Sequence, residues 1–230
     1  MKKLLIATTN PGKLAEIKRF LADVPIELVS LSDIGITESV AETGSTFEEN
    51  AILKATYYCQ KSGLPTLADD GGFEIDALGG EPGVKSHRWI HGDREDTDEE
   101  LIAYTLEKMR SLPRAKRGAQ LRLVLALVFP DGKVSTVEEK TRGIVAEKPS
   151  EHRTIGFPYR SLLFLPEINK YYDHDLLTPE ETEQFNHRKR ALDKLKPILK
   201  RLSLIIDVTR WYCIYCTLFL IWKTIYESIY

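Results

Sequence analysis

Short apolar runs alternate along this chain with segments whose apolar residues recur at helical spacing. The first run, Leu4–Thr8, is typical of a buried strand, and Leu14, Ile17 and Leu21 then repeat at i, i+3 and i+7 on one helix face. The same reasoning predicts strands at Ile26–Leu31, Pro65–Ala68, Leu121–Phe129 and Val134–Glu138, the last two joined as a hairpin by Pro130-Asp131-Gly132.

Capping residues predict where the helices begin. Asn10 followed by Pro11 favours a start directly after the first strand, because Asn accepts a backbone hydrogen bond and Pro fits the first helical position. A threonine three residues before a glutamate is the pattern of a capping box. That pattern predicts helices from Thr46, Thr97 and Thr178 to about Lys61 (stopped by Gly63), Arg110 and Leu202, with a kink at Pro197. No repeat or linker divides residues 1–202, so one α/β domain is expected there.

Residues 203–230 differ in character from the rest of the chain. Trp211–Trp222 is almost entirely apolar or aromatic, but it is shorter than the roughly 18–20 residues that a spanning helix needs. Cys213 and Cys216 form a Cys-x-x-Cys without visible partner ligands, which indicates no zinc or redox site. The tail could be an interfacial anchor, a dimer contact or an added segment without a role, and we expect no membrane contact.

Composition narrows the functional classes. Lys and Arg total 32 against 34 Asp and Glu, so the formal net charge of −2 argues against a general nucleic-acid binder. Three cysteines do not make a disulfide framework. The amino-terminal apolar run stops at Thr8, too early for a signal peptide, and predicts a cytoplasmic protein.

The junction Thr8-Thr9-Asn10-Pro11-Gly12-Lys13 is the first candidate site. A helix amino terminus offers unpaired N–H groups and a positive dipole end, which suit a phosphate. Gly12 lets the backbone approach a ligand, and Lys13 adds a positive charge. The alternative is a capped helix with a surface lysine.

Two further candidates lie in the first half of the chain. Phe47, Asn50 and Lys54 share one helical face that could point at an anionic ligand, or that helix could simply be half-exposed. Asp69-Asp70-Gly71-Gly72 ends a predicted strand, at the edge where open α/β sheets bind ligands. Its carboxylates, completed by Glu42, would suit magnesium, and one could deprotonate a water. The alternative is a solvated acidic turn.

The last candidates come late in the sequence. Phe157 within Gly156-Phe157-Pro158-Tyr159 could stack on a base. His187 and Arg188, inside the last predicted helix, could donate hydrogen bonds to a carbonyl oxygen. On its own, such a His-Arg pair on a helix usually faces solvent.

Taken together and in order, these motifs resemble those of the inosine/xanthosine triphosphate pyrophosphatase family over about residues 1–202. The resemblance implies an elongated α/β domain with a central mixed sheet flanked by helices, in two lobes around a nucleotide cleft, usually as a homodimer. It also implies magnesium-dependent hydrolysis of non-canonical purine nucleoside triphosphates to a monophosphate and pyrophosphate. The motifs are Thr8-Thr9-Asn10-x-Gly12-Lys13, Glu42-Thr43-Gly44-x-Thr46-Phe47-x-x-Asn50-Ala51-x-x-Lys54-Ala55, Ala68-Asp69-Asp70-x-Gly72, Gly79-Gly80-x-Pro82-Gly83-x-x-Ser86-x-Arg88, Gly156-Phe157-x-Tyr159 and His187-Arg188.

The resemblance assigns roles residue by residue. Glu42 and Asp70 would hold the metal, and Asp70 would also activate the water. Arg188 would donate to the 6-keto oxygen that distinguishes hypoxanthine and xanthine from adenine. The remaining substrate-binding residues would be Thr8, Thr9, Asn10, Pro11, Gly12, Lys13, Lys54, Gly71, Arg88, Phe157, Pro158, Tyr159, Arg160, Thr182 and His187.

This chain departs from the family pattern on the nucleotide side. Gly71 stands where Ser is usual, and Pro158 and Arg160 replace the Gly and Asp of the common Gly-Phe-Gly-Tyr-Asp-Pro stretch. Thr182 replaces a common Lys, and Asn186 replaces the Ser before His-Arg. We therefore expect retained chemistry with an open base preference. The rival hypotheses are a pyrophosphatase of shifted base specificity and a nucleotide-binding module without turnover.

Overall fold

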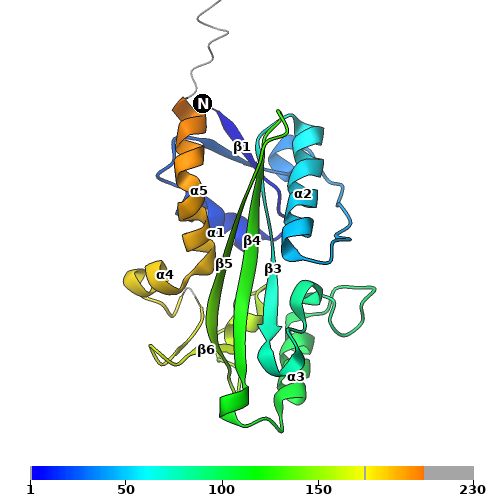
Figure 1. Cartoon of the computed structure of the whole chain (residues 1–230), viewed down its shortest axis with the longest axis vertical. Coiled ribbons are helices and arrows are strands. Elements are labelled where there is room, and N and C mark those ends of the chain that lie inside the picture. Colours follow the sequence, from blue (N-terminus) through cyan, green and yellow to red (C-terminus); the bar gives the residue numbers. More distant parts are fainter. Residues whose placement is uncertain (1, 174, 205–230) are drawn as a thin grey trace, which may run out of the picture.

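The computed structural model describes residues 2–173 and 175–204, which form a seven-stranded mixed sheet with helices on both faces (Figure 1). The strand order is β2-β1-β3-β4-β5-β6-β7, with β1 parallel to β2 and β3 and all later pairs antiparallel. The strands are β1 (Lys3–Ile6), β2 (Glu27–Ser30), β3 (Thr66–Ile75), β4 (Gly118–Val128), β5 (Val134–Val145), β6 (Leu163–Leu165) and β7 (Lys170–Tyr171). The α-helices are α1 (Pro11–Phe20), α2 (Phe47–Ser62), α3 (Asp98–Met109), α4 (Pro179–Phe185) and α5 (His187–Leu204). Short 3₁₀ turns are η1 (Ser32–Ile34), η2 (Asp76–Leu78), η3 (Gly83–Lys85), η4 (Arg114–Lys116) and η5 (Pro158–Ser161).

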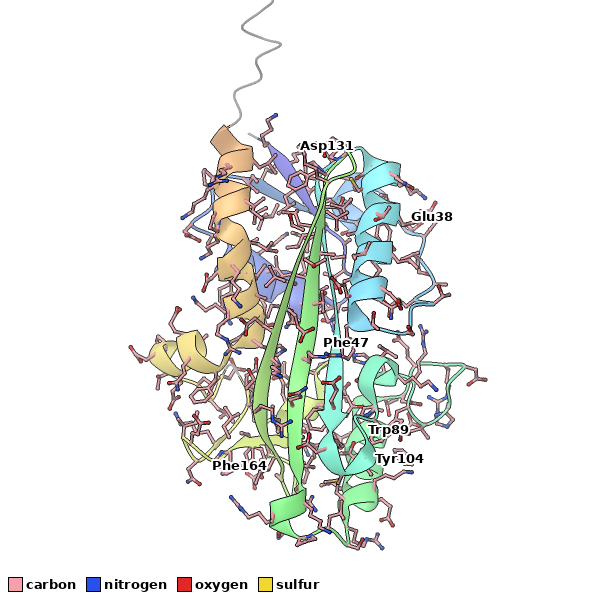
Figure 2. All side chains as sticks on the ribbon, viewed as in Figure 1. Glu38, Phe47, Trp89, Tyr104, Asp131 and Phe164 are labelled. Atoms are coloured by element: carbon pink, nitrogen blue, oxygen red, sulfur yellow. The ribbon has the colours of Figure 1, made fainter. Side chains whose placement is uncertain are left out.

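Alternation along β4 divides the core into two layers, because successive side chains of a strand point to opposite faces. Leu123, Leu125 and Leu127 pack with apolar residues of α1 and α5. The even-numbered residues between them pack against α2 on the other face. The expected sheet flanked by helices is confirmed, and the hairpin turn with Asp131 lies at its far tip (Figure 2).

The long strands also connect two lobes of an elongated molecule (Figure 1). Past Gly72, Phe73 and Ile75 of β3 enter a third apolar cluster with α3, η5 and β6. Asp69–Gly72 therefore occupies the middle of β3, where the three clusters meet.

The predicted strand at Pro65–Ala68 was too short, and Asp69-Asp70-Gly71-Gly72 is not a turn at its end. β3 continues to Ile75 and pairs with β4 throughout. The glycines permit close packing: a β-carbon on Gly71 would lie 2.5 Å from the Arg122 carbonyl oxygen, and one on Gly72 2.1 Å from Ser86 Oγ. The prediction failed because glycine marks a turn or a close approach equally well in a sequence.

The predicted single helix from Thr178 to Leu202 is wrong in its continuity. Asn186 adopts φ −75° and ψ 102°, which separates α4 from α5, and its Oδ1 accepts a hydrogen bond from the Lys189 N–H at 3.0 Å. An asparagine after one helix and before the next can therefore cap the second. Side-chain caps confirm the predicted helix starts at Asn10, Thr46, Thr97 and Thr178. The predicted stop of α2 at Gly63 is also confirmed, by the left-handed backbone of this glycine (φ 68°).

No helix within residues 2–173 and 175–204 combines the length and apolarity needed to cross a bilayer. The side chains of the predicted tail, residues 203–230, with its Cys213 and Cys216, lie outside the described residues. The third cysteine, Cys59, is a buried free thiol in α2.

Candidate active site

Two adjoining cavities open over the middle of β3. The outer cavity, about 770 Å³, is lined by residues of the β1–α1 junction, the loop before α2, α2 itself and β3, among them Lys13, Glu42 and Asp70. The inner cavity, about 50 Å³, is lined by Lys13, Phe157 and Arg188, among others. Lys13 lines both. Residues that are far apart in sequence thus meet in one crevice, as the motif order predicts.

The β1–α1 junction is fixed by its own hydrogen bonds. Asn10 Oδ1 accepts from the Lys13 N–H at 3.1 Å, and the Asn10 N–H donates to Thr8 Oγ1 at 3.2 Å. The Asn10 amide donates to the Gly156 carbonyl at 3.4 Å, so this donor binds the chain itself rather than pointing free into the cavity. The outer cavity is lined by Thr8, Thr9, Asn10, Pro11 and Lys13 of this junction.

Gly12 has a steric role that the sequence did not indicate. A β-carbon at this position would lie 2.5 Å from Phe157 Cε2, closer than side chains pack. Gly12 lines neither cavity and instead lets the Phe157 ring rest against the start of α1. The missing side chain at Gly12 therefore allows the β1–α1 junction to pack against Phe157, which lines the inner cavity.

The carboxylates of Glu42 and Asp70 converge on one ammonium. Lys54 Nζ lies 2.8 Å from Glu42 Oε1 and 3.1 Å from Asp70 Oδ1. Burial alone would lower the pKa of Lys54, but the charges of Asp70, Asp69 and Glu42 raise it. Two carboxylate oxygens that can reach the same cationic group are a donor set that fits magnesium.

Of the three residues predicted to share a ligand-facing side of α2, only Lys54 reaches the outer cavity. Phe47, in the first turn of α2, is buried against the sheet (Figure 2), where the Arg122 guanidinium lies 5.0 Å from its ring centre. Asn50 is also buried, and its Oδ1 accepts from the Gly44 N–H at 2.7 Å. Lys54 alone lines the outer cavity. The face predicted to point at a ligand is thus largely a packing face.

Asp69, on the opposite side of β3 from Asp70, joins a buried ion-pair network. Its Oδ2 lies 3.1 Å from Lys13 Nζ and 3.0 Å from Arg188 Nη2. Although burial alone raises it, the charges of Lys13 and Arg188 hold the pKa of Asp69 well below its ordinary value. Asp69 therefore stays ionised and fixes two cations of the site.

Glu16 completes this network and was missed by the sequence analysis. Its carboxylate lies 2.6 Å from Arg188 Nη1 and 2.8 Å from Arg160 Nη2, and all three side chains are at most 5% exposed. Burial alone would raise the pKa of Glu16, but the charges of Arg188 and Arg160 lower it. One signal was available, because an arginine in place of the usual acid at position 160 needs a new acidic partner.

The walls of the inner cavity are aromatic and cationic. The Arg160 guanidinium lies 3.8 Å from the centre of the Phe157 ring. Tyr159 donates its hydroxyl to the Ser86 carbonyl at 2.7 Å and stacks on Phe73, so its polar atom supports the fold. Pro158, the first residue of η5, also lines this cavity.

His187 lies at the start of α5 beside Arg188. Its Nδ1 is 2.7 Å from the Tyr172 hydroxyl, and burial together with the Arg188 charge lowers its pKa well below the ordinary value. His187 is therefore neutral near pH 7. The Nε–H of Arg188 is buried and has no acceptor within the described residues.

Two predicted substrate residues, Arg88 and Thr182, lie at the edge of the two cavities or outside them. Arg88 lines the outer cavity, with its guanidinium 4.0 Å from the Glu95 carboxylate and half-exposed. Thr182 lies within α4 and lines neither of the two cavities, so its role stays a prediction. Gly71 lines both cavities.

Comparison with known proteins shows where this site belongs. The Ham1 family matches residues 4–198, which include every residue named above as lining the two cavities. The chain belongs to the Ham1 family. This Ham1 chain has the two carboxylates and two lysines of the motif set, and Arg160 in the wall of the inner cavity pairs with Glu16.

Individual relatives span nearly the whole described chain. The chain is 42% identical over 193 residues to the dITP/XTP pyrophosphatase of Thermus thermophilus, covering 84% of this chain and 89% of that protein. It is 38% identical over 200 residues to the dITP/XTP pyrophosphatase of Bacillus subtilis, covering 87% and 98%. The structure of a HAM1 protein from Coxiella burnetii matches with a TM-score of 0.75 at 32% identity, covering 87% and 100%. The match therefore covers the whole of the solved Ham1 chain and most of this one.

Proposed function

We propose that this chain hydrolyses non-canonical purine nucleoside triphosphates, dITP/ITP and dXTP/XTP, to a nucleoside monophosphate and pyrophosphate. The observation that carries the proposal is the pair of adjoining cavities that share Lys13. One is lined by carboxylates and lysines, and the other by aromatic rings and arginines. A nucleotide is divided in the same way, into a polyanionic end and an aromatic base. The names of the relatives support the same substrate class.

In the outer cavity, Glu42 and Asp70 would hold magnesium, which supplies charge neutralisation on the phosphates when bound. Burial raises the pKa of Asp70, and the Glu42 charge adds to this, while Lys54 opposes it. Asp70 takes the proton of the attacking water as the α–β anhydride breaks and pyrophosphate leaves. Lys13, Lys54 and the α1 amino terminus position the phosphates.

In the inner cavity, the buried Nε–H of Arg188 would gain an acceptor from the 6-keto oxygen of hypoxanthine or xanthine. Adenine presents a 6-amino donor there and would leave the Arg188 donor unpaired, which is costly in a buried site. A cavity of about 50 Å³ holds only about four waters, so binding of a purine base would require its walls to move apart. Phe157 and Arg160, stacked on each other, form one such wall.

The finer parts of the proposal are magnesium as the ion, a homodimer as the assembly and the cytoplasm as the compartment. The carboxylate donors of Glu42 and Asp70 support magnesium. Light scattering during size-exclusion chromatography tests the assembly: we expect twice the chain mass, and a monomer contradicts it.

A substrate panel tests the reaction. Purified protein is given dITP, XTP, dATP, dGTP or dUTP with magnesium or with EDTA, and pyrophosphate is detected separately from orthophosphate. We expect pyrophosphate from dITP and XTP, with kcat/KM at least about 100-fold above that for dATP, and none with EDTA. Orthophosphate as the first product contradicts the bond assignment. Binding without turnover indicates a sequestering module, and a preference for dUTP indicates a shifted specificity.

A further inference from the structure

His87 lies where the two cavities meet. Two of the residues that line both cavities are glycines, and the other polar side chains are committed: Ser86 Oγ donates to the Gly83 carbonyl at 2.6 Å, and Lys13 Nζ lies 3.1 Å from Asp69. The imidazole of His87, which is half-buried, makes no hydrogen bond to any other described residue. The residues that line both cavities are Lys13, Gly71, Ser86, His87 and Gly156.

The backbone that carries His87 is held from both sides. Ser86, directly before it, receives the Phe73 N–H on its Oγ at 2.9 Å and the Tyr159 hydroxyl on its carbonyl at 2.7 Å. The His87 carbonyl itself accepts from the Asp96 N–H at 2.8 Å. A half-buried side chain without a partner on a fixed backbone is preorganised for a ligand.

The chemical state of His87 suits a phosphoester. Burial lowers its pKa and the nearby Lys13 charge lowers it further, so the ring is neutral near pH 7 and carries one N–H donor and one acceptor. If the phosphates fill the outer cavity and the base the inner one, the sugar and the α-phosphate cross the position of His87. This step rests on the proposed function.

We propose that His87 binds the sugar–α-phosphate segment of the nucleotide and so positions the bond that is cleaved. The sequence motif Ser86-x-Arg88 drew attention to Arg88, which lies at the half-exposed rim beside Glu95. The structure assigns the contact to the residue between them, because that residue lines both cavities.

Product inhibition tests the contact, because the sugar and the α-phosphate remain in dIMP while the other two phosphates leave as pyrophosphate. With dITP as substrate, inhibition constants for dIMP and for pyrophosphate are measured on the wild type, His87→Ala, His87→Gln and Lys85→Ala. We expect His87→Ala to weaken inhibition by dIMP roughly 10- to 100-fold and that by pyrophosphate less than about twofold. His87→Gln, which keeps a donor and an acceptor, should recover part of the loss. Lys85→Ala, an exposed change on the adjoining turn η3, should match the wild type.

Unchanged inhibition by dIMP in His87→Ala overturns the inference, as does an equal loss for dIMP and pyrophosphate, which would indicate a distorted site. If the wild type releases no pyrophosphate, the proposed function fails separately, and calorimetric titration of the same four proteins with dIMP then tests His87 by binding alone. A wild type that binds no dIMP overturns both.

Discussion

Asp69 and Asp70 are neighbours in β3, yet the two sides of this strand give them opposite surroundings. Asp69 is 2% exposed and is matched by Lys13 and Arg188, with Glu16 binding the same arginine. Asp70 lies beside a second carboxylate, Glu42, with Lys54 between them. The pKa is lowered for Asp69 and raised for Asp70. Because alternate residues of a strand face opposite ways, one acidic pair can supply both a structural anion and a reactive carboxylate.

The largest expected effect separates the two acids by activity. Asp70→Asn keeps the shape of the side chain but removes the carboxylate that we propose as proton acceptor and metal ligand. We expect kcat for dITP to fall by about 10³-fold, within the range for loss of a general base, while the thermal unfolding midpoint stays near that of the wild type. A rate within tenfold of the wild type would show that Asp70 is not the base.

The second test separates them by stability. Asp69→Asn leaves Lys13 and Arg188 buried with less compensating charge, and we expect the free energy of unfolding in urea at pH 7 to fall by about 3 kcal/mol. Asp70→Asn is the matched control and should cost little, because burial already disfavours its charged form. Equal losses in the two variants would contradict the comparison.

The smallest effect is a pair of pH dependences of opposite sign, measured without magnesium. Since the folded pKa of Asp69 is lowered, its stabilisation is present above about pH 4 and is lost as pH falls towards the folded value. Since that of Asp70 is raised, the folded state holds its proton longer, and stability falls as pH rises from about 4 through the folded pKa. Asp69→Asn should therefore flatten the loss of stability in acid, and Asp70→Asn should make it steeper. Parallel curves for the two variants would show that their surroundings do not differ.

Local signals in the sequence predicted much of the fold. Capping boxes at Thr46, Thr97 and Thr178 and the Asn10 cap located four helix starts, because a cap involves only residues three apart. The extent of β3 could not be predicted, because it depends on pairing with β4, which is distant in sequence. The break at Asn186 carries a local signal, the cap from Asn186 Oδ1 to the Lys189 N–H, but an asparagine within a helical pattern does not by itself show that a new helix begins.

The candidate site, like the fold, was predicted only in part from the sequence. The ordered motifs brought out Lys13, Glu42, Lys54 and Asp70, which the structure gathers around one cavity. The sequence did not show that the Asn10 amide binds Gly156 or that Phe47 and Tyr159 hold the fold, since a residue type alone does not say whether its partner is a ligand or the chain itself. Glu16 escaped for the same reason, being one acidic residue on an otherwise ordinary helix.

By itself the sequence determined which chemical groups this protein possesses and where its helices begin, because caps and hydrophobic spacing act within a few residues. Only the tertiary structure decided which of two adjacent aspartates is neutralised and which is left beside another carboxylate. It also decided that His87 rather than Arg88 stands between the cavities. Charge and burial are set by groups more than a hundred residues away, as Glu16 and Arg188 show, and that distance is closed only when the chain folds.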